Sequence, residues 1–196
     1  MRQTADRRWL MFIGVTLFGF LLDWWTKHLA AVHLAGGPFR LFGSIIELVL
    51  VYNKAALFGL DPRRIIPGFP INVFFVFFTT IAIAVVVAYY GRLKKTEILL
   101  RWGLASILPG AIGNLFDRIV HPSLGVIDFI KLDLRIWPFN PWPVFNLADC
   151  YVTLGVGLMI VSFIREERRR MHAPNAQGSE TEDPSAGDHE PGMKTH

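Results

Sequence analysis

The sequence predicts an all-α membrane protein with four transmembrane helices. Hydrophobic residues make up 52% of the 196 residues, which is above the usual range of roughly 45–50% for soluble domains. They gather in four long blocks, and a helix needs about 20 apolar residues to cross a bilayer core. Basic residues lie mainly at the ends of these blocks, where they set the orientation of membrane proteins.

The four blocks are expected to span the membrane at about residues 9–31, 71–90, 98–116 and 146–164. The first block follows Arg7 and Arg8, as the apolar core of a signal peptide would. It contains Asp23 and Lys27 and lacks a small-x-small cleavage pattern, so we interpret it as a retained helix.

Two longer segments, residues 32–70 and 117–145, connect the blocks on one side. The first is rich in β-branched residues that alternate with others, which predicts short strands at the membrane surface. The second contains IWPFNPWPVF, a composition typical of the membrane–water interface. Residues 1–170 are therefore expected to form one membrane domain, and the polar residues 171–196 a disordered cytoplasmic tail.

The basic residues also predict the topology. If each block crosses once, three basic clusters fall on one side of the membrane, and the positive-inside rule places both termini in the cytoplasm. These clusters are Arg2, Arg7 and Arg8; Arg92, Lys94, Lys95 and Arg101; and Arg165, Arg168, Arg169 and Arg170.

Composition excludes several classes of function. The net charge of +4 does not indicate a nucleic-acid partner, because the basic residues do not form one patch. The single Cys150 excludes an internal disulfide, and none of the six histidines forms HxxxH or HExxH. We therefore expect no metal and no cofactor.

Acidic residues inside or beside the blocks are the candidates for chemistry, since a charge in the membrane is costly. Asp23 lies roughly 20 Å into the first block, and Lys27 follows it by one helical turn on the same face. An ion pair that only anchors the helix would give the same pattern, so this pair alone does not establish a site.

The third and fourth blocks carry the same spacing of asparagine and aspartate. Asn114 and Asp117 lie in GAIGNLFDR, which also contains Arg118, and Asn146 and Asp149 lie in FNLAD. Gly110, Ala111 and Gly113 would allow another helix to approach the third one closely. A helix cap could explain either asparagine–aspartate pair alone. It does not explain why two helices carry the same spacing at the same membrane depth.

Asp128 lies between these two motifs, in the apolar run GVIDF. We expect Asp117, Asp128 and Asp149 to converge near the outer surface. Two carboxylates that share a site hold a proton between them, and such a pair can act as general base and general acid.

Five motifs occur in order along the chain: DWWTK, VYNKAALF, GAIGNLFDR, GVIDF and FNLAD. Together they resemble the lipoprotein signal peptidase family, signal peptidase II, over about residues 9–164. The resemblance implies a membrane-embedded aspartic endopeptidase. Its substrates would be bacterial prolipoproteins that carry a diacylglyceryl group, cut on the N-terminal side of the lipidated cysteine.

The resemblance also implies roles for individual residues. Asp128 and Asp149 match the catalytic aspartates of the family. It further implies a small periplasmic or extracellular β-cradle and a short surface helix. We also expect a bacterial cytoplasmic (inner) membrane location, contact with membrane lipid and a monomer. The polar residues that match those supporting the site or contacting substrate are Asp23, Lys27, Asn53, Asn114, Asp117, Arg118 and Asn146.

The chain departs from the family pattern at three places. Ala55 stands where the family usually has glycine, the stretch between Asp117 and Asp128 is slightly long, and Cys150 replaces a small polar residue. A small ion channel or transporter, with acids lining an outer vestibule, is the alternative from another class. It predicts acids spread through the membrane depth, whereas the acids here gather at the outer ends. A lipid-modifying transferase would favour a cytoplasmic metal-binding acid cluster, which the sequence lacks.

Overall fold

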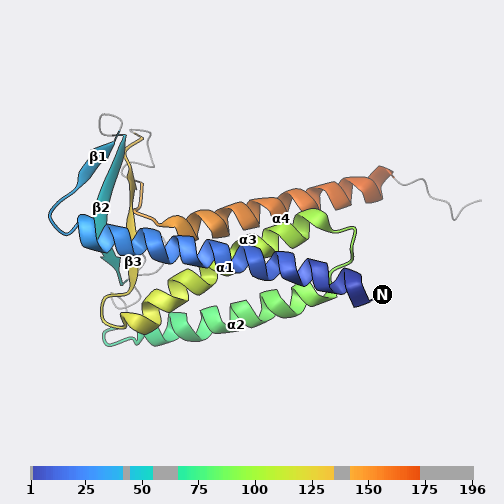
Figure 1. Ribbon diagram of the computed structural model, residues 1–196, viewed down its shortest axis with the longest axis horizontal. Coiled ribbons are helices and arrows are strands. Elements are labelled where there is room, and N and C mark those ends of the chain that lie inside the picture. Colours follow the sequence, from blue (N-terminus) through green and yellow to red (C-terminus); the bar gives the residue numbers. More distant parts are fainter. Residues whose placement is uncertain (1, 42–44, 55–65, 135–141, 173–196) are drawn as a thin grey trace, which may run out of the picture.

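The computed structural model describes residues 2–41, 45–54, 66–134 and 142–172. Within these ranges the chain forms four long helices and a three-stranded sheet (Figure 1). The helices are α1 (Arg2–His33), α2 (Ile71–Arg92), α3 (Ile98–Val120) and α4 (Leu147–His172). All four are long and apolar enough to cross a membrane, which confirms the predicted fold class.

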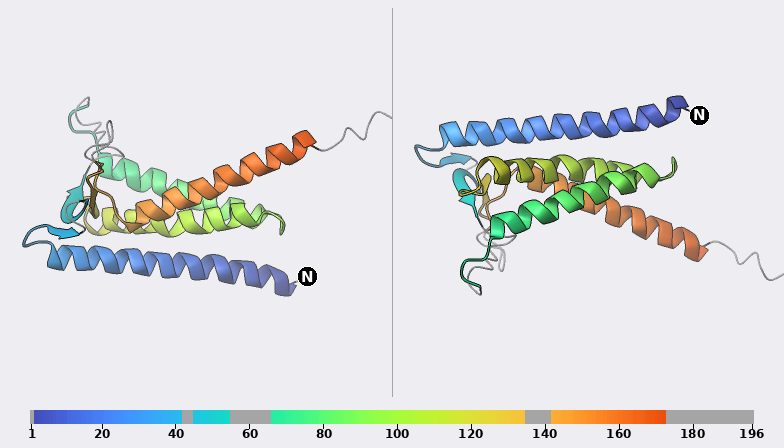
Figure 2. Two further views of the ribbon diagram at one scale, coloured as in Figure 1. Left: turned by 90° about the horizontal axis from the view of Figure 1, so that it is seen from above. Right: turned by 90° about the horizontal axis from the view of Figure 1, so that it is seen from below.

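The helices lie side by side, and the sheet covers one end of the bundle (Figure 1). The start of α1 and the end of α4 both lie at the opposite end, as four successive crossings require. We call these the sheet end and the far end. Both views in Figure 2 show the last part of α4 diverging from the other helices.

Helix α3 is the centre of the bundle, because it packs against each of the other three helices. Half of its most apolar stretch is buried, against 6–17% for the other helices. Glycines make this packing close: a Cβ atom on Gly103 would lie 2.9 Å from the carbonyl oxygen of Gly155 on α4. Gly110 and Gly113 likewise have no room for a side chain, as their sequence context predicted.

The helices extend beyond the apolar blocks that predict them. α3 continues to Val120, so Asp117 and Arg118 belong to its last turns and not to the connecting segment. α4 continues to His172, and Glu166 and Arg170 pair across one turn of this polar extension at 3.5 Å. Where a helix leaves the bilayer it no longer needs an apolar surface. The apolar blocks therefore underestimate the lengths of α3 and α4. The rest of the predicted tail, residues 173–196, lies outside the described residues.

The sheet consists of β1 (Phe39–Leu41), β2 (Ile46–Asn53) and β3 (Val126–Leu132), antiparallel in that order. Strands in residues 32–70 were predicted, but the third strand, from the later segment, was not. Apart from the last residues of α1, the described part of residues 32–70 contains no helix. Residues 42–44 and 55–65, which include Ala55, lie outside the described residues, so the expected surface helix stays a prediction.

A polar and aromatic clasp closes the far end. The guanidinium of Arg8 on α1 donates to the carbonyl oxygens of Gly91 and Leu93 at the end of α2, both at 3.1 Å. In return, the hydroxyl of Tyr90 donates to the carbonyl oxygen of Arg8 at 2.8 Å. The Tyr90 ring stacks on Phe12 at 3.9 Å and is fully buried. The clasp therefore satisfies backbone groups that the end of α2 leaves without helical partners.

We predict that Tyr90→Phe destabilises the protein by about 1 kcal/mol, because the hydrogen bond from the Tyr90 hydroxyl to the carbonyl of Arg8 is lost. The neighbouring Tyr89→Phe is the matched control, since Tyr89 is 40% exposed on the same helix. Thermal unfolding in detergent would measure both. Equal stability of the two variants would show that the hydrogen bond from Tyr90 to Arg8 contributes nothing to stability.

Candidate active site

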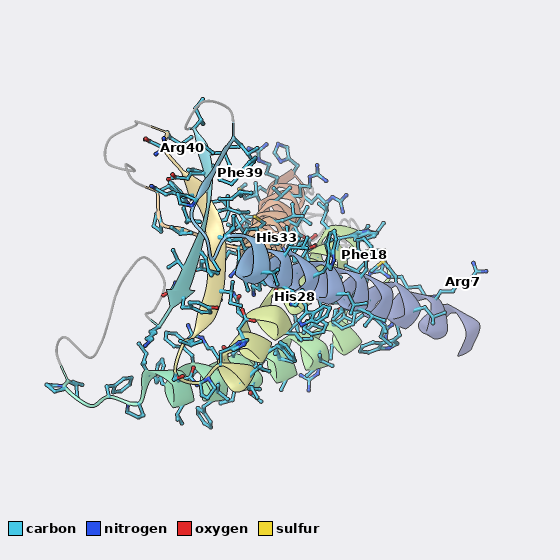
Figure 3. All side chains as sticks on the ribbon, turned by 60° about the vertical axis from the view of Figure 1, so that its left-hand side comes forward. Arg7, Phe18, His28, His33, Phe39 and Arg40 are labelled. Carbon is cyan, nitrogen blue, oxygen red and sulfur yellow. The ribbon has the colours of Figure 1, made fainter. Side chains whose placement is uncertain are left out.

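The polar residues that the sequence singles out meet at the sheet end, where α1, α3 and α4 converge under β2 and β3. On α1 they lie in the half of the helix nearest the sheet, a stretch that Phe18, His28 and His33 mark in Figure 3. Asp23 and Lys27 on this stretch are 0% and 2% exposed, although both carry charge. A charge buried this deeply requires partners, and the structure supplies them.

Lys27 joins α1 to α3. Its ammonium nitrogen lies 2.8 Å from a carboxylate oxygen of Asp23 and 2.9 Å from one of Asp117. It also donates to the side-chain oxygen of Asn114 at 2.9 Å. The second oxygen of Asp23 accepts the backbone N–H of Ala148, at the start of α4, at 2.9 Å. Gly113 makes room for this arrangement, because a Cβ atom there would collide with the Asp23 carboxylate.

Asn146 and Asp149 cap α4. Asn146 immediately precedes the helix, and its side-chain oxygen accepts the backbone N–H of Asp149 at 3.1 Å. Reciprocally, the backbone N–H of Asn146 donates to one oxygen of Asp149 at 3.1 Å. This is a capping box, so the alternative interpretation of FNLAD as a helix cap is correct but incomplete. The other oxygen of Asp149 accepts the amide of Asn114 at 3.0 Å, which ties the same carboxylate to α3.

Asp128 enters the site from β3. It is 3% exposed, and its two oxygens accept the side-chain amides of Asn53 at 2.8 Å and Asn146 at 2.7 Å. Burial raises the pKa of the Asp128 carboxyl to about 6; the Asn53 hydrogen bond lowers it, and the nearby charge of Asp149 raises it. Asn146 therefore connects both aspartates, through its side chain to Asp128 and through its backbone to Asp149.

A register shift in the sheet brings Asn53 to Asp128. Between Leu48 and Val51 the β2–β3 pairing changes register, and β2 has one extra residue there. After the shift Val51 lies opposite Asp128 and Asn53 opposite Val126, so Asn53 shares the face of Asp128. With an unshifted register, Asn53 would lie on the other face.

A glycine turn leads into β3. Gly125 has a φ of +88°, which favours glycine, and its Cα lies against the backbone of Asn53 and Lys54. The backbone N–H of Ile127, two residues later, donates to Asp117 at 3.2 Å. The carbonyl of Ile127 accepts Asn146 at 3.2 Å, so the N–H and the C=O of Ile127 are both bound within the site.

Arg118 borders the site on the side of α2. Its guanidinium lies 4.2 Å from the centre of the Phe75 ring, and its backbone oxygen accepts the amide of Asn72 at 2.9 Å. Arg118, Asn72 and Lys54 line a small cavity of about 50 Å³ together with Ser123 and Gly125.

The structure thus brings every predicted site residue into or beside one network. Sequence reasoning missed three partners: Asn72, which is the one polar side chain in residues 71–78, and the backbone groups of Ile127 and Ala148. The sequence does not indicate which backbone groups will bind a side chain. Within the described part of the chain, no three His, Cys, Asp or Glu residues are arranged to hold a metal ion.

Comparisons with known proteins agree with this geometry. The family described as signal peptidase (SPase) II matches residues 15–165. A lipoprotein signal peptidase of Borrelia hermsii is 35% identical over 155 residues, covering 76% of this chain and 88% of that protein. One of Halalkalibacterium halodurans is 33% identical over 168 residues, covering 85% of this chain and all of that protein.

A solved structure has the same fold. It is described as a bacterial membrane enzyme, with a TM-score of 0.69 and 23% identity, and the match covers 83% of this chain and 92% of that one. The family match spans most of the chain, and both relatives are more than 30% identical over most of their length, so the chain belongs to the signal peptidase II family.

Proposed function

We propose that this chain is a membrane-embedded aspartic endopeptidase that removes the signal peptide from diacylglyceryl-modified prolipoproteins. Cleavage occurs on the N-terminal side of the lipidated cysteine. The observation that carries the proposal is that Asp128 and Asp149, from different elements, meet at one asparagine. The relatives' name, lipoprotein signal peptidase, supports the substrate class.

The two carboxyl groups share one proton in the resting enzyme, because two adjacent carboxylates do not both ionise cheaply. Asp128 is the buried member whose pKa is raised to about 6, so it is assigned the proton at pH values below about 6. Asp149 is assigned the carboxylate and takes a proton from water as the water oxygen bonds to the scissile carbonyl carbon. Asp128 then protonates the leaving nitrogen as the C–N bond breaks, which leaves a carboxylic acid and an amine.

The surrounding residues hold this pair and are assigned supporting roles. Asn53, Asn114 and Asn146 donate to the two carboxyl groups and so fix where their oxygens point. Asp23, Lys27 and Asp117 connect the helices that carry them. Arg118, at the border of the site beside Lys54, is placed to contact the peptide backbone of the substrate.

The family and the predicted topology together support a location. We place the chain in the bacterial inner membrane with both termini in the cytoplasm and the sheet end outside. The diacyl chains then stay in the outer leaflet, where each buried CH₂ contributes roughly 0.8 kcal/mol, while the peptide enters the site. One chain supplies every described contact of the site, so a monomer suffices.

The alternative of a channel or transporter finds no supporting observation. It requires acids along a path through the membrane, but Asp23 is bound to Lys27 and Ala148 and the others lie at the sheet end.

We predict that Asp128→Asn and Asp149→Asn each lower kcat at least about 10²-fold, because each removes one partner of the acid–base pair. Asp133→Asn is the matched control: Asp133 follows β3 and lies outside the network. Cleavage of a synthetic diacylglyceryl peptide by purified protein is the measurement. Near-wild-type turnover of either site variant, with the control also active, would remove that aspartate from catalysis.

The proposed topology predicts that single cysteines at Ser123 and Arg168, in a Cys150→Ser background, label from opposite sides of the membrane. Ser123 is exposed at the sheet end and Arg168 near the end of α4. A membrane-impermeant maleimide added to intact spheroplasts should label only the cysteine at 123. Labelling of both from the same side would contradict four crossings.

A further inference from the structure

All three hydrogens of the buried Lys27 ammonium have an acceptor. The ammonium offers three hydrogens and no acceptor, and three oxygens face it at 2.8–2.9 Å, from Asp23, Asp117 and Asn114. Lys27 is also the one buried lysine among the residues that the structure describes. The ion pairs with Asp23 on α1 and Asp117 on α3 would suffice to neutralise the ammonium and to join the two helices, so the bond to the neutral Asn114 calls for its own explanation.

The bond from Lys27 determines which way the Asn114 amide points. Because an ammonium can only donate, the atom of Asn114 that faces it must be the oxygen. The same oxygen accepts the amide of Asn146 at 3.1 Å. The NH₂ group of Asn114 is thereby turned the other way, where it donates to Asp149 at 3.0 Å. With the amide reversed, its NH₂ group would face an ammonium, and its oxygen would face a carboxylate.

The direction of hydrogen bonding thus passes from Lys27 through Asn114 to Asp149. Hydrogen bonds in such chains reinforce one another in a low-dielectric interior. The two acids beside Lys27 hold it in place, because each has a further donor of its own: Ala148 N–H for Asp23 and Ile127 N–H for Asp117. The ammonium is therefore fixed relative to the start of α4 and to β3, the elements that carry the two catalytic-type aspartates.

We propose that Lys27 is a positioning residue of the peptidase, which orients the Asn114 amide so that its NH₂ group is directed at Asp149. Lys27 acts through Asn114 and does not touch the substrate. The inference rests on the proposed function and deepens it, because it names what fixes the hydrogen bonding of the aspartate that activates water.

The test separates the donor that Lys27 provides from its charge. In an Asp117→Asn background, Lys27→Gln and Lys27→Met carry the same charge as each other and have side chains of similar size. They differ in whether a hydrogen-bond donor faces Asn114. We expect Lys27→Gln to keep kcat within about 3-fold of the Asp117→Asn parent. Lys27→Met should lower kcat about 10–100-fold with little change in KM, as expected when a reacting group is misplaced. Thermal unfolding of both proteins shows whether they are equally folded.

Equal kcat of the folded Gln and Met variants would overturn the inference, whether both are active or both inactive. A second variant leaves Lys27 untouched, in case those proteins do not fold: Asn114→Asp keeps an oxygen for Lys27 but removes the NH₂ group that faces Asp149. It should remain folded and lose activity at least about 10-fold. Retained activity of Asn114→Asp would also overturn the inference. Failure of the wild-type chain to cleave the lipidated peptide would instead refute the proposed function itself.

Discussion

The constraint on which the rest of this structure depends is the cost of burying carboxylates at the edge of a membrane. Asp23, Asp117 and Asp128 are at most 4% exposed, and an unpaired buried charge costs several kcal/mol. The chain meets this cost, and that of the half-buried Asp149, with one buried lysine, three asparagine amides and backbone N–H groups. These partners come from every helix except α2 and from two strands, so the polar network and the fold require each other.

Close packing of the helices makes the network possible. Gly110 lies against Ala148, and Gly113 lies against Asp23, so α1 and the start of α4 reach α3 within hydrogen-bonding distance of each other. The capping box of α4 serves the same end. The groups that stabilise the first turn of the helix, Asn146 and Asp149, also face Asp128 and Asn114, so the cap fixes the position of the site.

Much of this could be predicted from the sequence, because polar residues at the membrane are rare and their spacing along a helix is informative. The four spans, the convergence of Asp117, Asp128 and Asp149, and the glycine face of α3 were accessible in this way. The third strand could not be predicted, because VIDFIKL is equally compatible with a mostly apolar connection until β2 is known to lie beside it. The shifted register that brings Asn53 to Asp128 also depends on a pairing between distant segments. The contact of Lys27 with Asn114 joins two different helices, so residue spacing within either helix does not reveal it. The ends of α3 and α4 extend beyond the apolar blocks, so hydropathy does not predict them.

The pH dependence of kcat/KM tests the central claim, a proton shared by Asp128 and Asp149, most directly. Activity should fall as the pH rises through about 6, where Asp128 loses its proton. The Asn53 amide stabilises the charged form of Asp128 and lowers its pKa, so Asn53→Ala should move this limb to higher pH. A profile that stays flat from pH 5 to about 8, or a limb that moves to lower pH in Asn53→Ala, would contradict the account.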